Sequence, residues 1–98
     1  MKEYDILNEA AMYAKIHLAE LPGRRVSPDA DSLKALEKFS FALPDQPTEA
    51  EKILALLHVA GSPNTVASNG GRFFGYVFGG ALPASLAASW MVSAWDQN

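Results

Sequence analysis

Residues 73–95 read FFGYVFGGALPASLAASWMVSAW, a run of 23 residues without a charged side chain. A transmembrane helix needs about 20 apolar residues, so length alone raises that interpretation. Gly79, Gly80 and Pro83 interrupt the run, and the helix that follows Pro83 has roughly 12 residues, about 18 Å against the ~30 Å of a bilayer core. We therefore expect no membrane partner, and burial of this stretch against protein, either this chain or a larger body.

The charged residues are concentrated before this run. Seventeen of the 19 lie in positions 1–52, and only Arg72 and Asp96 follow. The net charge of -3 and the single adjacent basic pair, Arg24 and Arg25, argue against a nucleic-acid partner, which would need clustered Lys and Arg. A chain of 98 residues makes at most one small domain, which excludes a large self-contained enzyme.

Cysteine usage and the first residues bear on the compartment. The chain has no cysteine, which fits a reducing compartment and excludes disulfides and thiolate metal sites. Residues 1–9 alternate charged and apolar side chains, whereas a signal peptide has a basic start and then an apolar run. We expect a cytoplasmic chain.

The first helix is predicted over residues 2–21. Its apolar residues recur at spacings of four and three, which places them on one face. Pro22-Gly23 is expected to end it. The predicted face consists of Leu7, Ala11, Ala14, Leu18 and Leu21.

Three further helices follow from local signals. Asp29 or Asp31 is a plausible N-cap for a short helix over residues 32–39. Residues 48–51, Thr-Glu-Ala-Glu, match a capping box that would begin a third helix, stopped by Gly61-Ser62-Pro63. Pro83 suits the first turn of a last helix over residues 82–96. With residues 73–78 extended, the fold class is mainly α: about four helices and one short extended stretch.

The side chains that could carry chemistry form no recognised site. His17 and His58 have no second ligand three or four residues away, so both are expected to be structural. The glycine-rich residues 70–80 lack the G-x-G-x-x-G spacing and the P-loop lysine. We expect no catalytic, cofactor-binding or metal-binding residue. Five glycines near four aromatics indicate a backbone that bends sharply or lets a ligand or another chain approach, or equally a loop packed in a core.

Residues 72–84, RFFGYVFGGALPA, and 93–98, SAWDQN, resemble the N-terminal region of pyridoxal-phosphate-dependent group II amino-acid decarboxylases. The resemblance is strongest over residues 61–98, and the preceding helices fit the family's N-terminal arm. It implies one N-terminal segment, residues 1–98, of a fold-type-I enzyme whose large α/β domain is absent here. Residues 1–60 would be a charged helical arm, and residues 61–98 a loop at the substrate mouth followed by an apolar helix.

The resemblance also implies roles for particular residues. Tyr76, Phe78, Gly79 and Gly80 occupy the positions that contact the amino-acid substrate in that family. The helices would pack against the second subunit of a homodimer. The family's Schiff-base lysine lies beyond position 98, so this segment would not hold pyridoxal phosphate and would be inactive alone. Many members have His-Pro where this chain has Gly70-Gly71, so their substrate class is not transferred.

Three alternatives stay open. An aminotransferase-like activity on the same scaffold is one, because the residues that separate the two outcomes lie outside this sequence. A non-enzymatic helical module that docks its uncharged half on a partner protein is the second. A membrane-associated peptide that uses residues 73–95 is the third.

Overall fold

The computed structural model describes residues 2–75 and 79–97, and this part of the chain is mainly helical, without a strand. The prediction of a mainly α fold with four helices is thereby confirmed. The α-helices are α1 (Ile6–Glu20), α2 (Ala30–Ala35), α3 (Ala50–Leu56) and α4 (Pro83–Trp95). Shorter helical turns are Lys2–Tyr4, Leu36–Phe39, Leu57–Gly61 and Ser62–Asn64.

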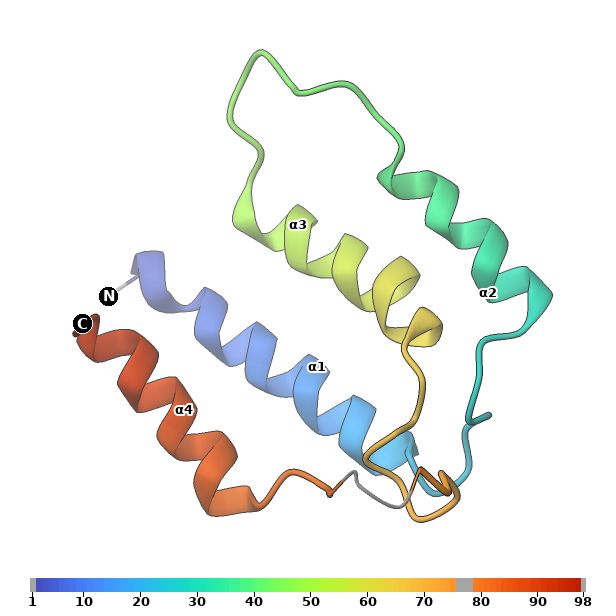
Figure 1. The fold of residues 1–98 in the computed structure, drawn as a ribbon. Coiled ribbons are helices and arrows are strands. Elements are labelled where there is room, and N and C mark those ends of the chain that lie inside the picture. Colours follow the sequence, from blue (N-terminus) through green and yellow to red (C-terminus); the bar gives the residue numbers. More distant parts are fainter. Residues whose placement is uncertain (1, 76–78, 98) are drawn as a thin grey trace.

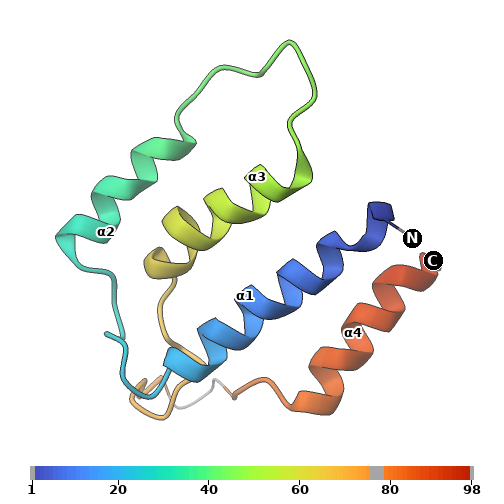
Figure 2. The same ribbon diagram turned by 180° about the vertical axis from the view of Figure 1, so that it is seen from behind.

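Helix α1 lies at the centre of the arrangement. It runs between α3 and α4, while α2 lies on the far side of α3 (Figure 1). The view from behind shows the same order, with the start of α1 beside the end of α4, so these two helices are antiparallel (Figure 2). The connection between α2 and α3 arches away from the helices, and every residue from 40 to 50 is exposed.

Two faces of α1 are used, and the sequence predicted one of them. Ala11, Ala14 and Leu18 of the predicted face line a groove against α4. A second set, Ala10, Tyr13 and His17, faces α3. A helix placed between two others needs two stripes, and the second was missed because a tyrosine and a histidine interrupt its apolar pattern.

The cap of α2 is confirmed at Asp29. The Ser32 backbone N–H donates to the Asp29 carboxylate at 2.8 Å, and this bond lowers the pKa of Asp29 from its ordinary value. The helix begins at Ala30, earlier than predicted, and continues from Leu36 to Phe39 as a 3₁₀ turn. The carboxylate therefore satisfies one of the four orphan N–H groups at the start of α2.

The predicted capping box before α3 is wrong. The N-cap is Glu49, without a side-chain cap bond, and the first turn closes as the Lys52 and Ile53 N–H groups donate to the Glu49 carbonyl. This start lies one residue beyond Thr48 and puts Glu51 at the second helical position instead of the third, so the reciprocal bonds of the box do not form.

The end of the α3 segment agrees with the predicted stop. A π-helical turn, Leu57–Gly61, extends α3 and is followed by the 3₁₀ turn Ser62–Asn64, which contains Pro63. The Asn64 side-chain amide donates to the Ser32 carbonyl at 2.6 Å and to the Ala60 carbonyl at 2.7 Å. These two bonds tie the start of α2 to the end of the α3 segment.

The loop before α4 shows no strand over residues 73–75, and the rest of the predicted extended stretch, residues 76–78, lies outside the described residues. Pro83 occupies the first turn of α4 as predicted. Asp96 ends the helix in the left-handed conformation, with φ 51°, and its N–H donates to the Val92 carbonyl. Aspartate reaches this conformation more readily than most residues, so α4 has a stop that the sequence did not reveal.

The described residues bury very little. Leu21, Ala60 and Ala67 are the buried apolar residues, and the accessible surface of 7953 Å² exceeds the roughly 5,500 Å² expected for a compact chain of this mass. The radius of gyration is 15.6 Å, against about 12.6 Å for a compact domain of this length. The helices thus pack loosely, with a small buried core. No helix in the described ranges is both long and apolar enough to cross a bilayer.

Ala60 is fully buried, so we predict that Ala60→Leu destabilises the chain by about 1–3 kcal/mol through overpacking. The measurement is urea unfolding followed by far-ultraviolet circular dichroism. Ala88→Leu, at an exposed position of α4, is the matched control and should be nearly neutral. Equal effects of the two substitutions would contradict this placement of the core.

Candidate functional site: the groove between α1 and α4

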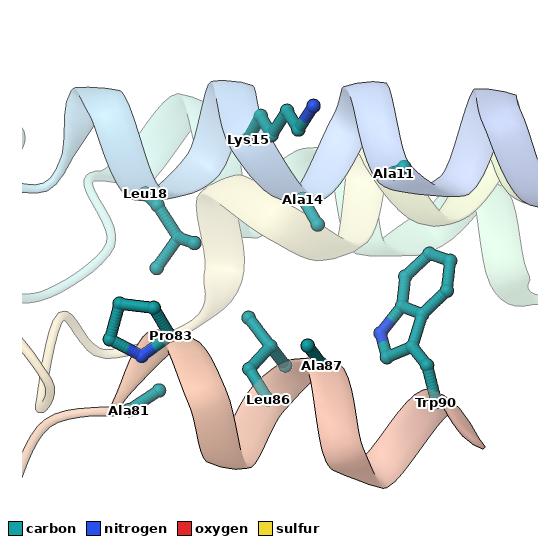
Figure 3. Close-up of a pocket in the computed structure, with 9 residues that line it drawn as sticks. All are labelled: Ala11, Ala14, Lys15, Leu18, Ala81, Pro83, Leu86, Ala87 and Trp90. Carbon is teal, nitrogen blue, oxygen red and sulfur yellow. The ribbon is translucent and has the colours of Figure 1, made fainter.

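The groove between α1 and α4 has a volume of about 390 Å³. Small side chains on both helices keep it open, and Leu18, Leu86 and Trp90 project into it (Figure 3). Lys15 lies at its edge with the amine directed away from α4 (Figure 3). The lining is Ala11, Ala14, Lys15, Leu18, Ala81, Pro83, Leu86, Ala87 and Trp90.

Helix α4 is uncovered over most of its surface. Leu86 is half-buried and the other residues of α4 are exposed. Trp90 is 38% exposed, whereas Met91, Val92 and Trp95 on its other faces are 54–59% exposed. Because none of its residues is charged, α4 presents apolar surface both into the groove and away from α1.

Of the predicted substrate contacts, Tyr76 and Phe78 lie outside the described residues. Gly79 and Gly80 are exposed and lead directly into Ala81, at the end of the groove. A Cβ at Gly79 would meet nothing within 4 Å, and no glycine in the described part of the chain has a positive φ. Neither a left-handed turn nor local crowding therefore requires glycine at position 79, and its backbone is open to approach by another molecule.

The groove can bind apolar surface, but its lining carries no acid–base chemistry. The side chains that face it are alanine, leucine, proline and tryptophan. Among the residues that the structure describes, no cluster of His, Cys, Asp and Glu could hold a metal ion. The arrangement is that of a docking surface, because the Trp90 indole N–H faces an otherwise apolar lining and the Lys15 amine is directed away from it (Figure 3).

The opposite side of α1 carries a polar junction with the α3 segment. One guanidinium nitrogen of Arg24 donates to His17 Nδ1 at 2.8 Å, and the other donates to the Ser62 carbonyl at 2.8 Å. His17 Nδ1 also lies 3.0 Å from the Ser62 hydroxyl. One turn earlier on α1, Tyr13 stacks on His58, with ring centroids 4.3 Å apart. Each histidine thus has a side-chain partner within the chain.

Sequence reasoning missed the role of Arg24. Arg24 lies in the turn after α1, beyond the helical periodicity that His17 follows, so the pattern of the helix gave no signal for this bond. Ser62 is 45 residues from His17 and gave no local indication. Partial burial and the neighbouring Arg24 charge lower the pKa of His17 from 6.5, in keeping with a neutral ring that accepts a bond from arginine.

Comparisons with known proteins found no family model, no curated protein and no solved structure that matches this chain. The function of the chain is therefore inferred from its own residues and their geometry.

Docking of α4 on α1 predicts different environments for the two tryptophans. The measurement is tryptophan fluorescence of two variants: Trp95→Phe reports Trp90 alone, and Trp90→Phe reports Trp95 alone. Trp90 should emit at a shorter wavelength than Trp95, and iodide should quench it less. The accessibility to quencher should follow the exposed fractions of 38% and 59%. Ala14→Asp, which places a charge on the α1 side of the groove, should remove the difference; identical quenching in the two single-tryptophan chains would show that α4 is not docked.

Proposed function

We propose that this chain is the N-terminal segment of a pyridoxal-phosphate-dependent amino-acid decarboxylase-like enzyme, in which it contributes contacts at the substrate mouth and in a homodimer. The observation that carries the proposal is the uncharged stretch of residues 73–95, which ends in a helix that the rest of the chain leaves uncovered. In an enzyme of this class that helix would gain its cover from a large domain and a second subunit.

The size of the uncovered surface supports an arm that packs against a larger body. The chain exposes roughly 2,500 Å² more than a compact protein of its mass, part of it on the arched 40–49 connection. A protein interface of standard size covers about 800 Å² on each partner, so the excess can accommodate more than one contact. Because α4 carries no charged side chain, its surface would not repel a large domain or a second copy of the chain.

The chain's own residues do not fit a site for pyridoxal phosphate. The lysine beside the groove, Lys15, directs its amine away from it, and no cationic side chain points into the groove to bind a phosphate (Figure 3). The cofactor would therefore be held by residues outside positions 1–98, as the family resemblance implies. The part left for this chain is to shape the entrance, where Gly79 and Gly80 would allow an amino-acid substrate close to the backbone.

The proposal includes a cytoplasmic location for the enzyme. The absence of cysteine fits a reducing compartment. The reaction class is carboxy-lyase, with an aminotransferase outcome as the alternative on the same scaffold. The decisive genetic observation is the coding DNA after the Asn98 codon: a continuing frame with a large α/β domain and a Schiff-base lysine supports the proposal, whereas a stop codon contradicts it.

We predict that the purified 98-residue chain neither forms a Schiff base with pyridoxal phosphate at a defined site nor releases carbon dioxide from amino acids. The physical reason is that Lys15, the lysine at the groove, directs its amine away from it and is not placed to form a Schiff base there (Figure 3). Absorbance spectra with added cofactor and a carbon dioxide release assay over the common amino acids provide the measurement. Stoichiometric Schiff-base absorbance together with decarboxylation would refute the proposal that the cofactor is held by residues outside this segment.

Gly79→Ala tests the substrate-mouth role in a longer enzyme that contains this segment. Because the added Cβ meets nothing within 4 Å among the described residues, helix content should be unchanged, while kcat/KM should fall by about tenfold to a hundredfold through crowding of the substrate. Gly23→Ala, where a Cβ also meets nothing within 4 Å, is the matched control and should leave kcat/KM unchanged. Equal activity of the two variants would show that Gly79 does not contact the substrate.

A helical interaction module is the second candidate, and the exposed α4 is the observation that favours it. This module would dock α4 and the groove on a partner protein without taking part in catalysis. The genetic test above separates the candidates, since the module requires no downstream catalytic domain.

A further inference from the structure

His17 lies where three segments of the chain meet. It belongs to the last turns of α1, it accepts a bond from Arg24 in the turn that follows α1, and it lies 3.0 Å from the hydroxyl of Ser62. Arg24 closes the triangle through its bond to the Ser62 carbonyl. The end of α1 is thereby joined to the 3₁₀ turn that terminates the α3 segment.

The geometry defines the protonation state of His17. An arginine side chain has only donors and stays charged at any accessible pH, so a nitrogen 2.8 Å from it must accept with its lone pair. His17 Nδ1 is therefore unprotonated, and the ring proton of the neutral imidazole lies on Nε2. A proton on Nδ1 would remove this acceptor and put a second positive charge against the guanidinium.

We propose that His17 is a proton-operated latch: the neutral ring accepts the bond from Arg24 at the end of α1, and protonation of Nδ1 breaks this bond and repels the guanidinium, which is itself bonded to the Ser62 carbonyl. The latch depends on contacts within residues 17–72 and does not rest on the proposed function.

The surroundings of His17 favour its neutral form overall. Partial burial has the largest effect, the Arg24 charge adds to it, and His58 from the π-helical turn acts in the same direction. Glu20, one turn further along α1, acts in the opposite direction. The balance lowers the pKa of His17 below 6.5, so release requires mildly acidic conditions.

The sign of the effect follows from this balance. In the closed junction His17 binds its proton less readily than in the open chain, so acid favours the open state. The stabilisation is fully present above pH 6.5 and is lost as the pH falls from there through the lowered value of the closed state. Each unit of difference between the two pKa values favours opening by about tenfold at low pH.

Release of Arg24 would affect the loop before α4. The Arg24 carbonyl accepts a bond from the guanidinium of Arg72 at 3.1 Å, and Arg72 directly precedes the aromatic and glycine-rich stretch. The Val26 carbonyl, two residues further on, accepts the Ala67 N–H at 2.8 Å and does not depend on the histidine. Opening should therefore move Arg24, Ser62 and Arg72 while the Val26–Ala67 bond holds.

The first test uses the unmodified chain. Long-range ¹H–¹⁵N spectra at about pH 8 should show the Nε2–H tautomer for His17, and a titration should give it a pKa below 6.5. Thr65 reports on the junction because its N–H donates to the Ser62 carbonyl at 3.2 Å. The amide signals of Ser62 and Thr65 and the side-chain signal of Arg72 should shift with the same midpoint, and the amide signal of Ala67 should stay constant. An Nδ1–H tautomer, or a pKa at or above 6.5, would overturn the latch.

Two variants separate the latch from general acid sensitivity. His17→Asn keeps an acceptor near the Nδ1 position but cannot gain a proton, so the pH-dependent shifts at Ser62, Thr65 and Arg72 should disappear. His58→Phe, the matched control, removes the other histidine while it keeps an aromatic ring against Tyr13, and the shifts should remain. Persistence of the shifts in His17→Asn would reject the proposal, as would their loss in His58→Phe alone.

Discussion

The guanidinium of Arg24 is the interaction on which the placement of α1 against the α3 segment depends. It bridges His17 on α1 and the carbonyl of Ser62 after α3, while the backbone carbonyl of Arg24 accepts a bond from the Arg72 guanidinium. Bonds from a charged donor are stronger than those between neutral groups. Because three apolar residues are buried in the described part of the chain, such a junction fixes geometry that a larger core would otherwise fix.

The two sides of α1 differ in the forces that they use. Towards α3 the contact is specific, with hydrogen bonds and the Tyr13–His58 stack. Towards α4 it is a shallow apolar groove lined by alanine and leucine, to which many apolar surfaces could be complementary. The contacts on the α3 side fix how α1 is placed against the α3 segment. The α4 side leaves an apolar surface for the larger body that we propose.

Local signals predicted the elements well where they act within one turn of a helix. Asp29 caps α2, Pro83 begins α4, and Pro63 lies in the turn that ends the α3 segment. The capping box at Thr48 failed because a shift of one residue at a helix start is enough to separate its partners. Gly79 and Gly80, which lead into the candidate site, were named through the family resemblance and remain a prediction. The groove itself could not be predicted, because its two walls are α1 and α4.

The sequence by itself determined that the chain is helical, approximately where the helices begin and end, and that its last helix is uncharged, because these properties depend on near neighbours and composition. Only the tertiary structure decided which faces of α1 meet α3 and α4, and that Arg24 serves as the junction. Those contacts join residues separated by up to 48 positions. Periodicity shows that a helix has an apolar face but does not specify what that face meets, so the polar partners of His17 and the uncovered state of α4 emerged only once the helices were placed in space.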